Sequence, residues 1–241
     1  MKLLMVANHR KDKRYPKDRL KTLLKAQIQN SLELGWLPSQ IVIFTNFGFS
    51  HKGVDAFCES LNDFCLTGSK MFAVQLAMRW MWPDTIWAHD LDCWQNVEFE
   101  EPKFPGDVGI ARYSTEKYNG GSVFWKPKSR DIVDNIVNTL KKTGEAIEEP
   151  TLNKMLRSKK FKERVSVIDN GFNVGCSGFK IRYERAEKPI RVGHFHPYNR
   201  LAWETFALNR HNLPGRIITE RLEKVIRYFF PGLPETVKVK A

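Results

Sequence analysis

The sequence predicts an α/β protein in which helices cover both faces of a mixed central sheet. In the first half, short apolar runs rich in β-branched residues alternate with helical segments, a pattern typical of a parallel sheet. The apolar runs of the second half are less regular, which indicates mixed strand directions. No repeat, low-complexity stretch or Pro/Gly/Ser-rich linker interrupts the 241 residues. We therefore expect one Rossmann-like domain over residues 1–205 and a C-terminal basic helical extension over residues 206–241, packed on the domain.

The first half reads strand, helix, strand, helix, strand. Leucine and isoleucine recur at helical spacing from residue 20 to residue 32, and Gly35 stands where a helix C-cap belongs. A second helix starts at a Gly-Ser turn, and Pro83 ends it. The expected strands are 3–8, 41–47 and 85–92, and the expected helices are 16–36 and 68–82.

The second half predicts strands 107–113 and 121–126 joined by a turn over 114–120, then helices 129–142 and 148–158. Short strands are expected at 164–169, 172–183 and 190–195. The extension carries an apolar stripe and an opposite basic face, which favours packing on the domain over binding to a membrane. The stripe consists of Ile217, Ile218, Leu222, Val225, Ile226 and Phe229, and the basic face of Arg216, Arg221, Lys224 and Arg227.

The net charge of +12 is unevenly distributed. Residues 154–241 hold 19 Lys/Arg and 8 Asp/Glu, residues 10–25 hold 8 and 2, and the segment between them is net acidic. This pattern favours a protein that handles an anion held by a metal, next to a larger anionic partner. A basic surface that only keeps the protein in solution is the alternative.

The cysteines and the hydropathy pattern favour a cytoplasmic location. The four cysteines form no CxxC pair and no metal-binding spacing, which is typical of reduced thiols in a cytosolic protein. No apolar run reaches the ~18 residues of a membrane helix. The first residues combine a short apolar run with charge, so we interpret them as a strand and not as a signal peptide.

Two carboxylates follow the apolar strand over residues 85–89. Ligands of open α/β sheets bind at the carboxyl ends of strands, which is where Asp90 and Asp92 stand. In an extended chain, residues i and i+2 point to the same side. Two oxygen ligands without thiols suit Mg²⁺ or Mn²⁺, which usually also bind substrate phosphates. A solvated turn is the alternative, because a lone Asp-x-Asp is a weak signal.

Three further motifs contain groups that could complete such a site. Asn119-Gly120-Gly121 offers an amide for sugar hydroxyls and a backbone that a ligand can approach closely. Glu148-Glu149 places two carboxylates at a helix start, where they could also only favour the helix dipole. His194 and His196 end a strand, and histidine would favour Mn²⁺, unless it is a satisfied strand-end histidine.

In this order, Asp90-Leu91-Asp92, Asn119-Gly120-Gly121, Glu148-Glu149-Pro150-Thr151-Leu152-Asn153 and His194-Phe195 resemble the GT-A glycosyltransferases over roughly residues 1–200. The resemblance implies a GT-A fold and sugar transfer from a nucleotide-diphosphate sugar, most simply a UDP-sugar. It implies Mn²⁺ or Mg²⁺ bound by Asp90, Asp92 and His194, with His196 as substitute. The first strand would hold the nucleotide base. The implied donor-binding residues are Ala7, Asn8, His9, Lys70 and Asp90. We add Gly120, Gly121 and Arg200 as candidate donor-binding residues because of their residue types, independently of the resemblance.

The resemblance is incomplete at the helix beginning with Glu148. Family members with a late histidine usually begin this helix with Asp-Gln-Asp, whereas this chain has Glu-Glu-Pro. Retention and inversion of the sugar's configuration both stay open. If the enzyme inverts, Glu148 or Glu149 should be the general base. We take Glu148, Glu149 and Asn119 as the candidate catalytic residues.

Other functions fit parts of the sequence. A metal nuclease could use Asp90, Asp92 and Glu149, and a nucleic-acid-binding module without catalysis would explain the charge alone. For a glycosyltransferase, the basic clusters favour a polyanionic acceptor, in particular DNA with hydroxymethylated bases. A surface glycan or a lipid-linked sugar at an anionic membrane is the alternative acceptor.

Overall fold

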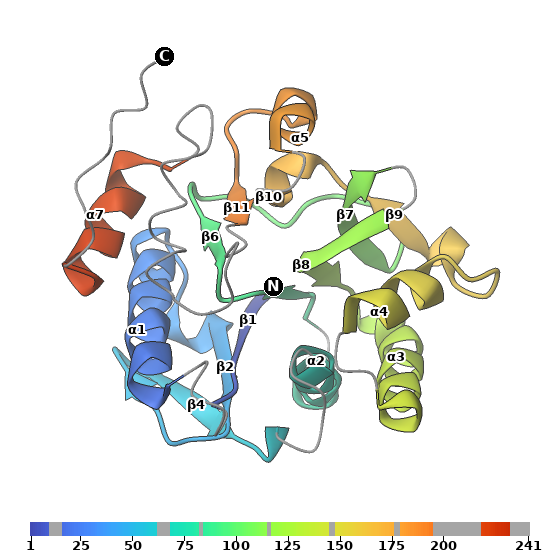
Figure 1. The fold of residues 1–241 in the computed structure, drawn as a ribbon, viewed down its shortest axis with the longest axis horizontal. Coiled ribbons are helices and arrows are strands. Elements are labelled where there is room, and N and C mark those ends of the chain that lie inside the picture. Colours follow the sequence, from blue (N-terminus) through green and yellow to red (C-terminus); the bar gives the residue numbers. More distant parts are fainter. Residues whose placement is uncertain are drawn as a thin grey trace.

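The computed structural model describes residues 1–9, 16–61, 68–81, 84–114, 117–144, 148–175, 179–194 and 218–231. Within them, a large mixed sheet lies between helical layers, and a small sheet lies beside it (Figure 1). The large sheet contains β1 (Lys2–Ala7), β2 (Ile41–Thr45), β3 (Ser50–His51), β4 (Val54–Cys58), β5 (Ile86–His89), β7 (Val108–Ser114), β8 (Lys117–Trp125) and β9 (Val165–Val167). The small sheet contains β6 (Cys93–Gln95), β10 (Val174–Gly175) and β11 (Val192–His194). The α-helices are α1 (Lys17–Glu33), α2 (Gly68–Trp80), α3 (Arg130–Thr143), α4 (Glu148–Leu156), α5 (Phe179–Arg185) and α7 (Glu220–Phe229).

The strand order of the large sheet is β3-β4-β2-β1-β5-β8-β7-β9. β4, β2, β1 and β5 are parallel neighbours, whereas β8 runs antiparallel to both β5 and β7. The prediction of a mixed central sheet with helices on both faces is therefore confirmed. Because β8 is antiparallel, its amino end meets the carboxyl ends of β1 and β5 at one edge of the sheet.

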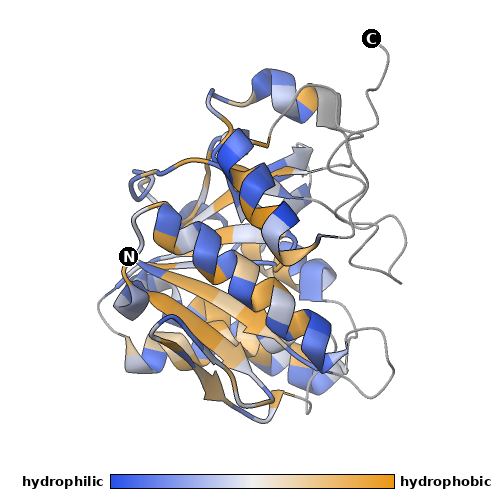
Figure 2. Cartoon of the chain, turned by 90° about the vertical axis from the view of Figure 1, so that its left-hand side faces the viewer, coloured by the Kyte–Doolittle hydropathy of each residue, from blue (hydrophilic) through white to orange (hydrophobic). Residues whose placement is uncertain are grey.

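Alternate residues of the strands face two separate apolar cores. In β1, Leu3 and Met5 pack toward α1 and α7, while Leu4 packs toward α2, α3 and α4. The side chains alternate because successive residues of a strand point to opposite faces. Figure 2 shows the resulting layers, with apolar strands between amphipathic helices. A near-continuous apolar run such as β2 is what a strand buried on both faces requires.

The expected helices form, and their ends follow the sequence signals. Gly35 has a φ of +84° just beyond α1, and Gly144 has a φ of +62° just beyond α3. This left-handed backbone is one that glycine adopts without a steric penalty. α3 and α4 lie within the bounds that periodicity predicted, to within one or two residues.

Two local predictions are wrong. Residues 117–120 belong to β8 and not to a turn, because the β7–β8 pairing continues through register shifts as far as Ser114 and Lys117. Residues 172–183 do not form one strand. They contain the end of a 3-10 helix, η5 (Asn170–Phe172), then β10, and most of α5. A short apolar run does not reveal by itself whether it continues as strand or helix.

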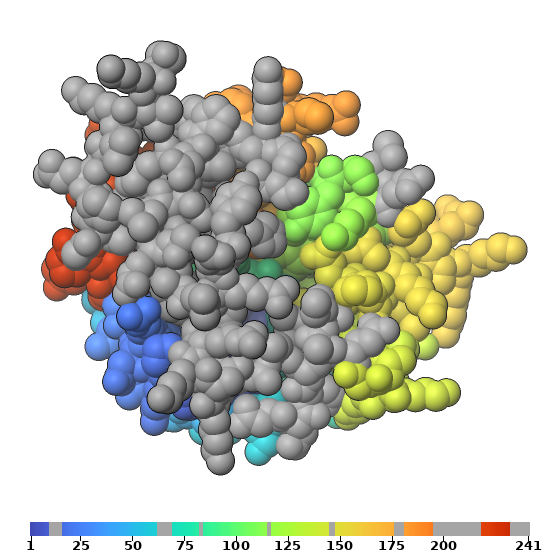
Figure 3. Space-filling view, in the orientation of Figure 1, coloured from blue at the N-terminus to red at the C-terminus, as the bar shows by residue number. Residues whose placement is uncertain are grey.

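The described part of the extension contains α7, which packs against α1. Figure 3 shows the two helices adjoining on the flank opposite α3 and α4. Leu222, Val225 and Ile226 are buried, and such side chains each contribute roughly 1.5–3 kcal/mol when fully buried. Ile217 and Arg216 lie outside the described residues. None of the described helices is long and apolar enough to cross a membrane.

Arg221 corrects the expectation of an open basic face on α7. Its guanidinium donates to Asn30 Oδ1 at 2.8 Å and approaches Glu33 Oε2 at 3.4 Å. It also reaches the carbonyl oxygens of Gln95 and Asn96, at 3.5 and 3.4 Å. Arg221 therefore ties α7 to α1 and to the end of β6, which its helical position alone could not reveal.

Candidate metal and donor site

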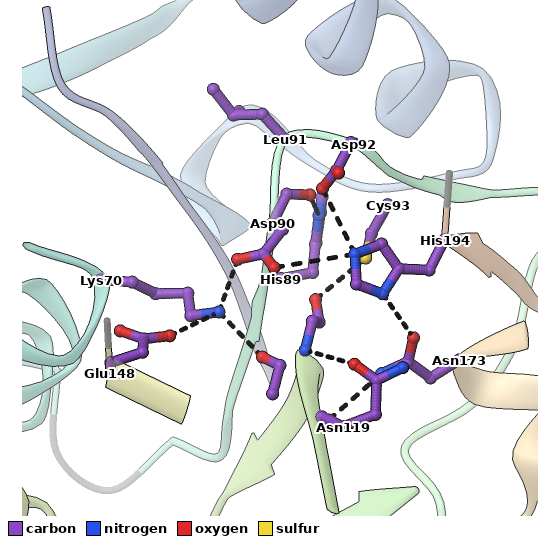
Figure 4. Close-up of polar contacts among 12 residues, drawn as sticks. Lys70, His89, Asp90, Leu91, Asp92, Cys93, Asn119, Glu148, Asn173 and His194 are labelled. Carbon is purple, nitrogen blue, oxygen red and sulfur yellow. Dashed lines mark hydrogen bonds and ion pairs between the residues drawn. The ribbon is translucent and has the colours of Figure 1, made fainter. Parts of the chain in front are cut away.

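Several of the predicted site residues, among them Asp90, Asp92 and His194, gather at the edge where β5, β8 and β11 meet (Figure 4). Asp90 follows β5 directly, and its backbone N–H donates to the Gly121 carbonyl of β8 at 2.8 Å. His89 Nδ1 lies 2.7 Å from the Asp90 carbonyl oxygen. Burial lowers the pKa of His89 to about 4, so this imidazole is neutral. Its Nδ1–H donates to the Asp90 carbonyl oxygen and fixes the backbone there.

Asp90 and Asp92 face the same point for a reason that differs from the predicted one. Leu91 and Asp92 form a turn, and the Cys93 N–H donates to the Asp90 carbonyl at 2.9 Å. The two carboxylates therefore converge through a turn and not along an extended strand. Their oxygens lie 3.8 Å (Asp90 Oδ2) and 3.4 Å (Asp92 Oδ1) from His194 Nε2.

The orientation of His194 is fixed by two asparagines. Asn173 Nδ2 donates to the Asn119 carbonyl at 3.3 Å, which turns Asn173 Oδ1 toward His194 Nδ1 at 3.0 Å. In the neutral ring, Nδ1 then carries the proton, and Nε2 presents its lone pair to the two carboxylates. An imidazole nitrogen and two carboxylates form a ligand set that suits a divalent cation such as Mn²⁺.

Gly121 is the residue that lets the His194 ring enter the site. A Cβ at this position would lie 2.1 Å from His194 Cε1 and 2.3 Å from Nδ1. No side chain fits there unless the ring moves. A Cβ at Gly120 would meet only Leu152 Cδ2, at 3.6 Å, which is an ordinary contact. The two glycines of the motif therefore have different structural roles.

Lys70, on the first turn of α2, joins three groups of the site. Its Nζ lies 2.5 Å from Asp90 Oδ1 and 2.9 Å from Glu148 Oε1, and it donates to the Gly120 carbonyl at 2.8 Å. Burial alone would lower the pKa of Lys70, but the two adjacent carboxylates outweigh it and raise the pKa. Lys70 is therefore charged, and its charge compensates that of Asp90. The sequence alone did not predict this ion pair.

The two glutamates of α4 have different surroundings. The side chain of Glu148 is 6% exposed, and burial raises its pKa to about 7. The Glu149 side chain is 24% exposed, and it pairs with Lys117 at 2.7 Å. Burial, followed by the charge of Glu149, raises the pKa of Tyr113. Glu149 is thus the more accessible carboxylate of the pair.

The end of β1 lies along the same sheet edge. Ala7 closes the strand, and the side chain of Asn8 donates to the Leu61 carbonyl at 3.3 Å. Asn46, beyond β2, binds His9 twice, because its Oδ1 accepts from the His9 N–H and its Nδ2 donates to the His9 carbonyl, each at 2.7 Å. The side chain of Asn46 therefore fixes the backbone after β1.

Asn119 is wholly buried at the start of β8. Its Oδ1 accepts from the Gly121 N–H at 3.0 Å, and within the described residues its Nδ2 has no hydrogen-bond partner. Asn119 thus supports Gly121 and, through its carbonyl, Asn173. Arg200 and His196, which were also predicted for the site, lie outside the described residues.

Sequence reasoning did not assign Asn173 and Cys93 to the site. Cys93 Sγ donates to the Gly121 carbonyl at 3.0 Å, and burial raises the pKa of the thiol. Cys93 adjoins the aspartate pair in sequence, so adjacency was an available signal. Asn173 lies far from every motif in sequence, so only its contact with His194 reveals it.

Solved structures of glycosyltransferases resemble the chain. One is a glycosyltransferase involved in the glycosylation of the major capsid of PBCV-1, with a TM-score of 0.52, 12% identity, and coverage of 83% of this chain and 95% of that one. The galactosyltransferase LgtC in complex with donor and acceptor sugar analogs has a TM-score of 0.54 and 12% identity, over 93% of this chain and 100% of that one. GlyE of Streptococcus pneumoniae TIGR4 has a TM-score of 0.56 and 13% identity, over 99% and 66%.

No protein-family model and no curated protein sequence matches the chain. The identities of the solved structures are low, so the likeness concerns the fold. The mixed sheet with flanking helices is consistent with this likeness. The chain therefore has the GT-A-like fold of these glycosyltransferases.

Proposed function

We propose that the protein is a metal-dependent glycosyltransferase that moves a sugar from a nucleotide-diphosphate sugar to a hydroxyl group. The observation that supports this best is the convergence of Asp90, Asp92 and His194, with the His194 lone pair directed at the carboxylates. It occurs at the carboxyl edge of the sheet, where open α/β proteins bind ligands. The glycosyltransferases of similar fold add support for the reaction class.

In this proposal, Asp90, Asp92 and His194 hold Mn²⁺ or Mg²⁺. A divalent cation offsets, as a Lewis acid, the negative charge that a leaving nucleoside diphosphate develops. Lys70 neutralises the second oxygen of Asp90 and so leaves Oδ2 directed at His194. Asn173 keeps the His194 ring in the tautomer that a metal needs.

The donor would lie along the edge formed by the ends of β1 and β5. Ala7, Asn8 and His9 are proposed to hold the base, with UDP as the expected carrier. Gly120 is proposed to allow close approach of the sugar, whereas Gly121 makes room for the His194 ring. The buried Nδ2 of Asn119 supplies a hydrogen-bond donor next to them. Arg200 is proposed to add positive charge near the diphosphate.

Glu149 is the carboxylate that we propose faces the acceptor hydroxyl. Its side chain is more exposed than that of Glu148, which is enclosed with Lys70. If the configuration inverts, Glu149 would accept the hydroxyl proton as general base. Glu148 would then act on the donor side, by holding Lys70 in position. Glu149→Gln should reduce transfer while donor binding is retained.

The acceptor is proposed to be polyanionic, with DNA that carries hydroxymethylated bases as the favoured case and a glycan at a membrane surface as the alternative. Lys154, Lys159 and Lys160 are exposed at and beyond the end of α4, the helix whose first residue is Glu148. Two other cations of the second half are engaged internally. Arg164 pairs with Asp107 and Asp131, and Arg191 approaches Asp169 and Glu187.

The direct test measures hydrolysis of a panel of nucleotide sugars with Mn²⁺, followed by transfer to hydroxymethylated DNA and to glycans. We expect metal-dependent release of nucleoside diphosphate from one donor, and its loss in Asp92→Asn. Cleavage of DNA without any nucleotide-sugar turnover would replace the proposal by a metal nuclease that uses Asp90, Asp92 and Glu149. Nucleic-acid binding without turnover of either kind would leave a binding module.

A further inference from the structure

We propose that Cys93 forms a second, thiolate-containing metal centre with Asp92 and His194. This centre selects Zn²⁺ over Mn²⁺. Ligand atoms of these three residues all lie within 4.8 Å of one another. A carboxylate, a thiolate and an imidazole together are a ligand set typical of zinc, with a fourth position left to water. Mn²⁺ and Mg²⁺ favour oxygen ligands instead.

The backbone places the thiol next to the imidazole. Cys93 in β6 and His194 in β11 are direct partners of an antiparallel pair. Side chains of such partners lie on the same face of the sheet, with Cβ atoms about 4.5–5.5 Å apart. Figure 4 shows the sulfur beside the His194 ring. The proximity therefore follows from the strand register and not from a chance side-chain rotamer.

The two ligand sets share Asp92 and His194 and differ in the third member. Asp90 completes the oxygen-rich set, and its other oxygen is held by Lys70. Cys93 completes the thiolate set, and its sulfur donates to the Gly121 carbonyl. Because Asp92 and His194 serve both, the two metals exclude each other. Provided that the proposed function holds, Zn²⁺ would inhibit the Mn²⁺-dependent transfer.

Binding to the thiolate set is an acid–base step without redox change. The Cys93 S–H bond breaks, the sulfur binds the cation as thiolate, and one proton passes to solvent. The hydrogen bond to the Gly121 carbonyl is lost at the same time. The charge that stabilises the thiolate comes from the metal, which deprotonates a coordinating thiol outright.

The test uses Co²⁺ as a spectroscopic substitute for Zn²⁺ on the full chain stripped of metal. Wild type should show the near-ultraviolet thiolate-to-cobalt charge-transfer band, and Zn²⁺ should abolish that band by displacement. Cys93→Ser retains a hydroxyl that can donate to the Gly121 carbonyl, and it should bind Co²⁺ without the band. Cys58→Ser, at an exposed cysteine, is the matched control and should keep the band.

The ratio of Zn²⁺ to Mn²⁺ affinity should fall in Cys93→Ser by at least about 10-fold, the lower end of what even outer-shell changes produce. Co²⁺ bound to wild type without the band, or a band that persists in Cys93→Ser, would overturn the proposal. X-ray absorption of the wild-type zinc complex needs no variant, and absence of a sulfur neighbour would overturn it equally.

These experiments distinguish failure of the thiolate centre from failure of the proposed function. Metal-dependent nucleotide-sugar binding without the band would leave that function standing and remove the thiolate centre. The band without any donor binding would establish the centre and remove the glycosyltransferase.

Discussion

In the proposed metal site, Asn173 would act only through its contact with His194, and this gives the first residue-scale prediction. Asn173→Ala removes the acceptor that keeps the proton on Nδ1, so Mn²⁺ affinity should fall by about 10–100-fold. His194→Ala should lower it further. Asn173→Asp keeps an acceptor for Nδ1 and should restore most of the affinity. Manganese electron paramagnetic resonance measures all three. Equal affinity of Asn173→Ala and wild type would refute this tautomer assignment.

The second residue-scale prediction concerns Glu148, whose pKa rises from 4.5 to about 7 in the folded protein, mainly by burial. Between these values the folded state holds a proton that the unfolded state has lost. Its contribution to the free energy of unfolding therefore falls as the pH rises from about 4.5 to 7, by at most about 1.4 kcal/mol per pH unit. Glu148→Gln lacks this dependence.

Urea unfolding at several pH values compares Glu148→Gln with wild type. We expect the variant to gain relative stability as the pH rises through this window. A constant difference between the two proteins would show that Glu148 titrates normally in the folded state. The paired variant Glu149→Gln retains Glu148, so its stability should still fall as the pH rises through this window.

At the residue scale, the sequence indicated which residues could be metal ligands but not the contacts that hold them in place. Asp90, Asp92 and His194 could be selected from strand-end positions, and the structure brings them together. The roles of Lys70 and Asn173 could not, because each depends on a contact between residues far apart in the chain. Single-sequence patterns contain spacing along an element, not distances between elements.

At the element scale, the start of β8 leaves room for the His194 ring only because residue 121 is glycine; position 120 has no such requirement. Gly121→Ala should displace the His194 ring, because its Cβ would lie 2.1 Å from Cε1. We expect a loss of stability of about 1–3 kcal/mol, as for other overpacked sites, and weaker Mn²⁺ binding.

Gly120→Ala is the matched control, since its Cβ makes only an ordinary contact with Leu152. Thermal unfolding and manganese titration should leave it close to wild type in both stability and metal affinity. If both alanine variants behave alike, the close packing of His194 on Gly121 is not the reason that glycine is needed at position 121.

Elements with strong periodicity could be predicted from the sequence, and elements without it could not. α3 and α4 follow from their apolar spacing and their ends. The β3–β4 hairpin was not predicted, because β4 has one buried position among five and no alternation. The stretch over 172–183 changes from 3-10 helix to strand to helix within a few residues, and its strand pairs with β11, which is distant in sequence.

At the scale of the whole molecule, charge predicts weak and sequence-independent binding to duplex DNA. Each neutralised phosphate contributes about −0.9 to the slope of log affinity against log salt concentration. Replacing Lys154, Lys159 and Lys160 by glutamine should flatten that slope by roughly 2–3. Replacing Lys52, Lys103 and Lys224, which are exposed elsewhere on the described surface, should change it less.

Fluorescence anisotropy at increasing salt concentration measures this slope. Binding that does not depend on salt, or equal slopes for the two triple variants, would remove the α4 end as the DNA contact. Transfer to a glycan and none to hydroxymethylated DNA would favour the alternative acceptor.

The global architecture could be inferred because alternating strands and helices permit few arrangements. The position of α7 could be inferred only in part. Its apolar stripe predicted packing on the domain, but not that Arg221 would bind α1 and the end of β6. Net charge likewise predicted an anionic partner, although several of the arginines that contribute to it are neutralised within the fold.

The central claim is that Asp90, Asp92 and His194 bind a metal that in turn holds a nucleotide-diphosphate donor. The most direct measurement is a calorimetric titration of the protein with UDP, with and without Mn²⁺, in wild type and Asp92→Ala. We predict that wild type binds UDP much more tightly with Mn²⁺ and that Asp92→Ala loses this gain while remaining folded. Metal-dependent binding of equal strength in both proteins would contradict the account.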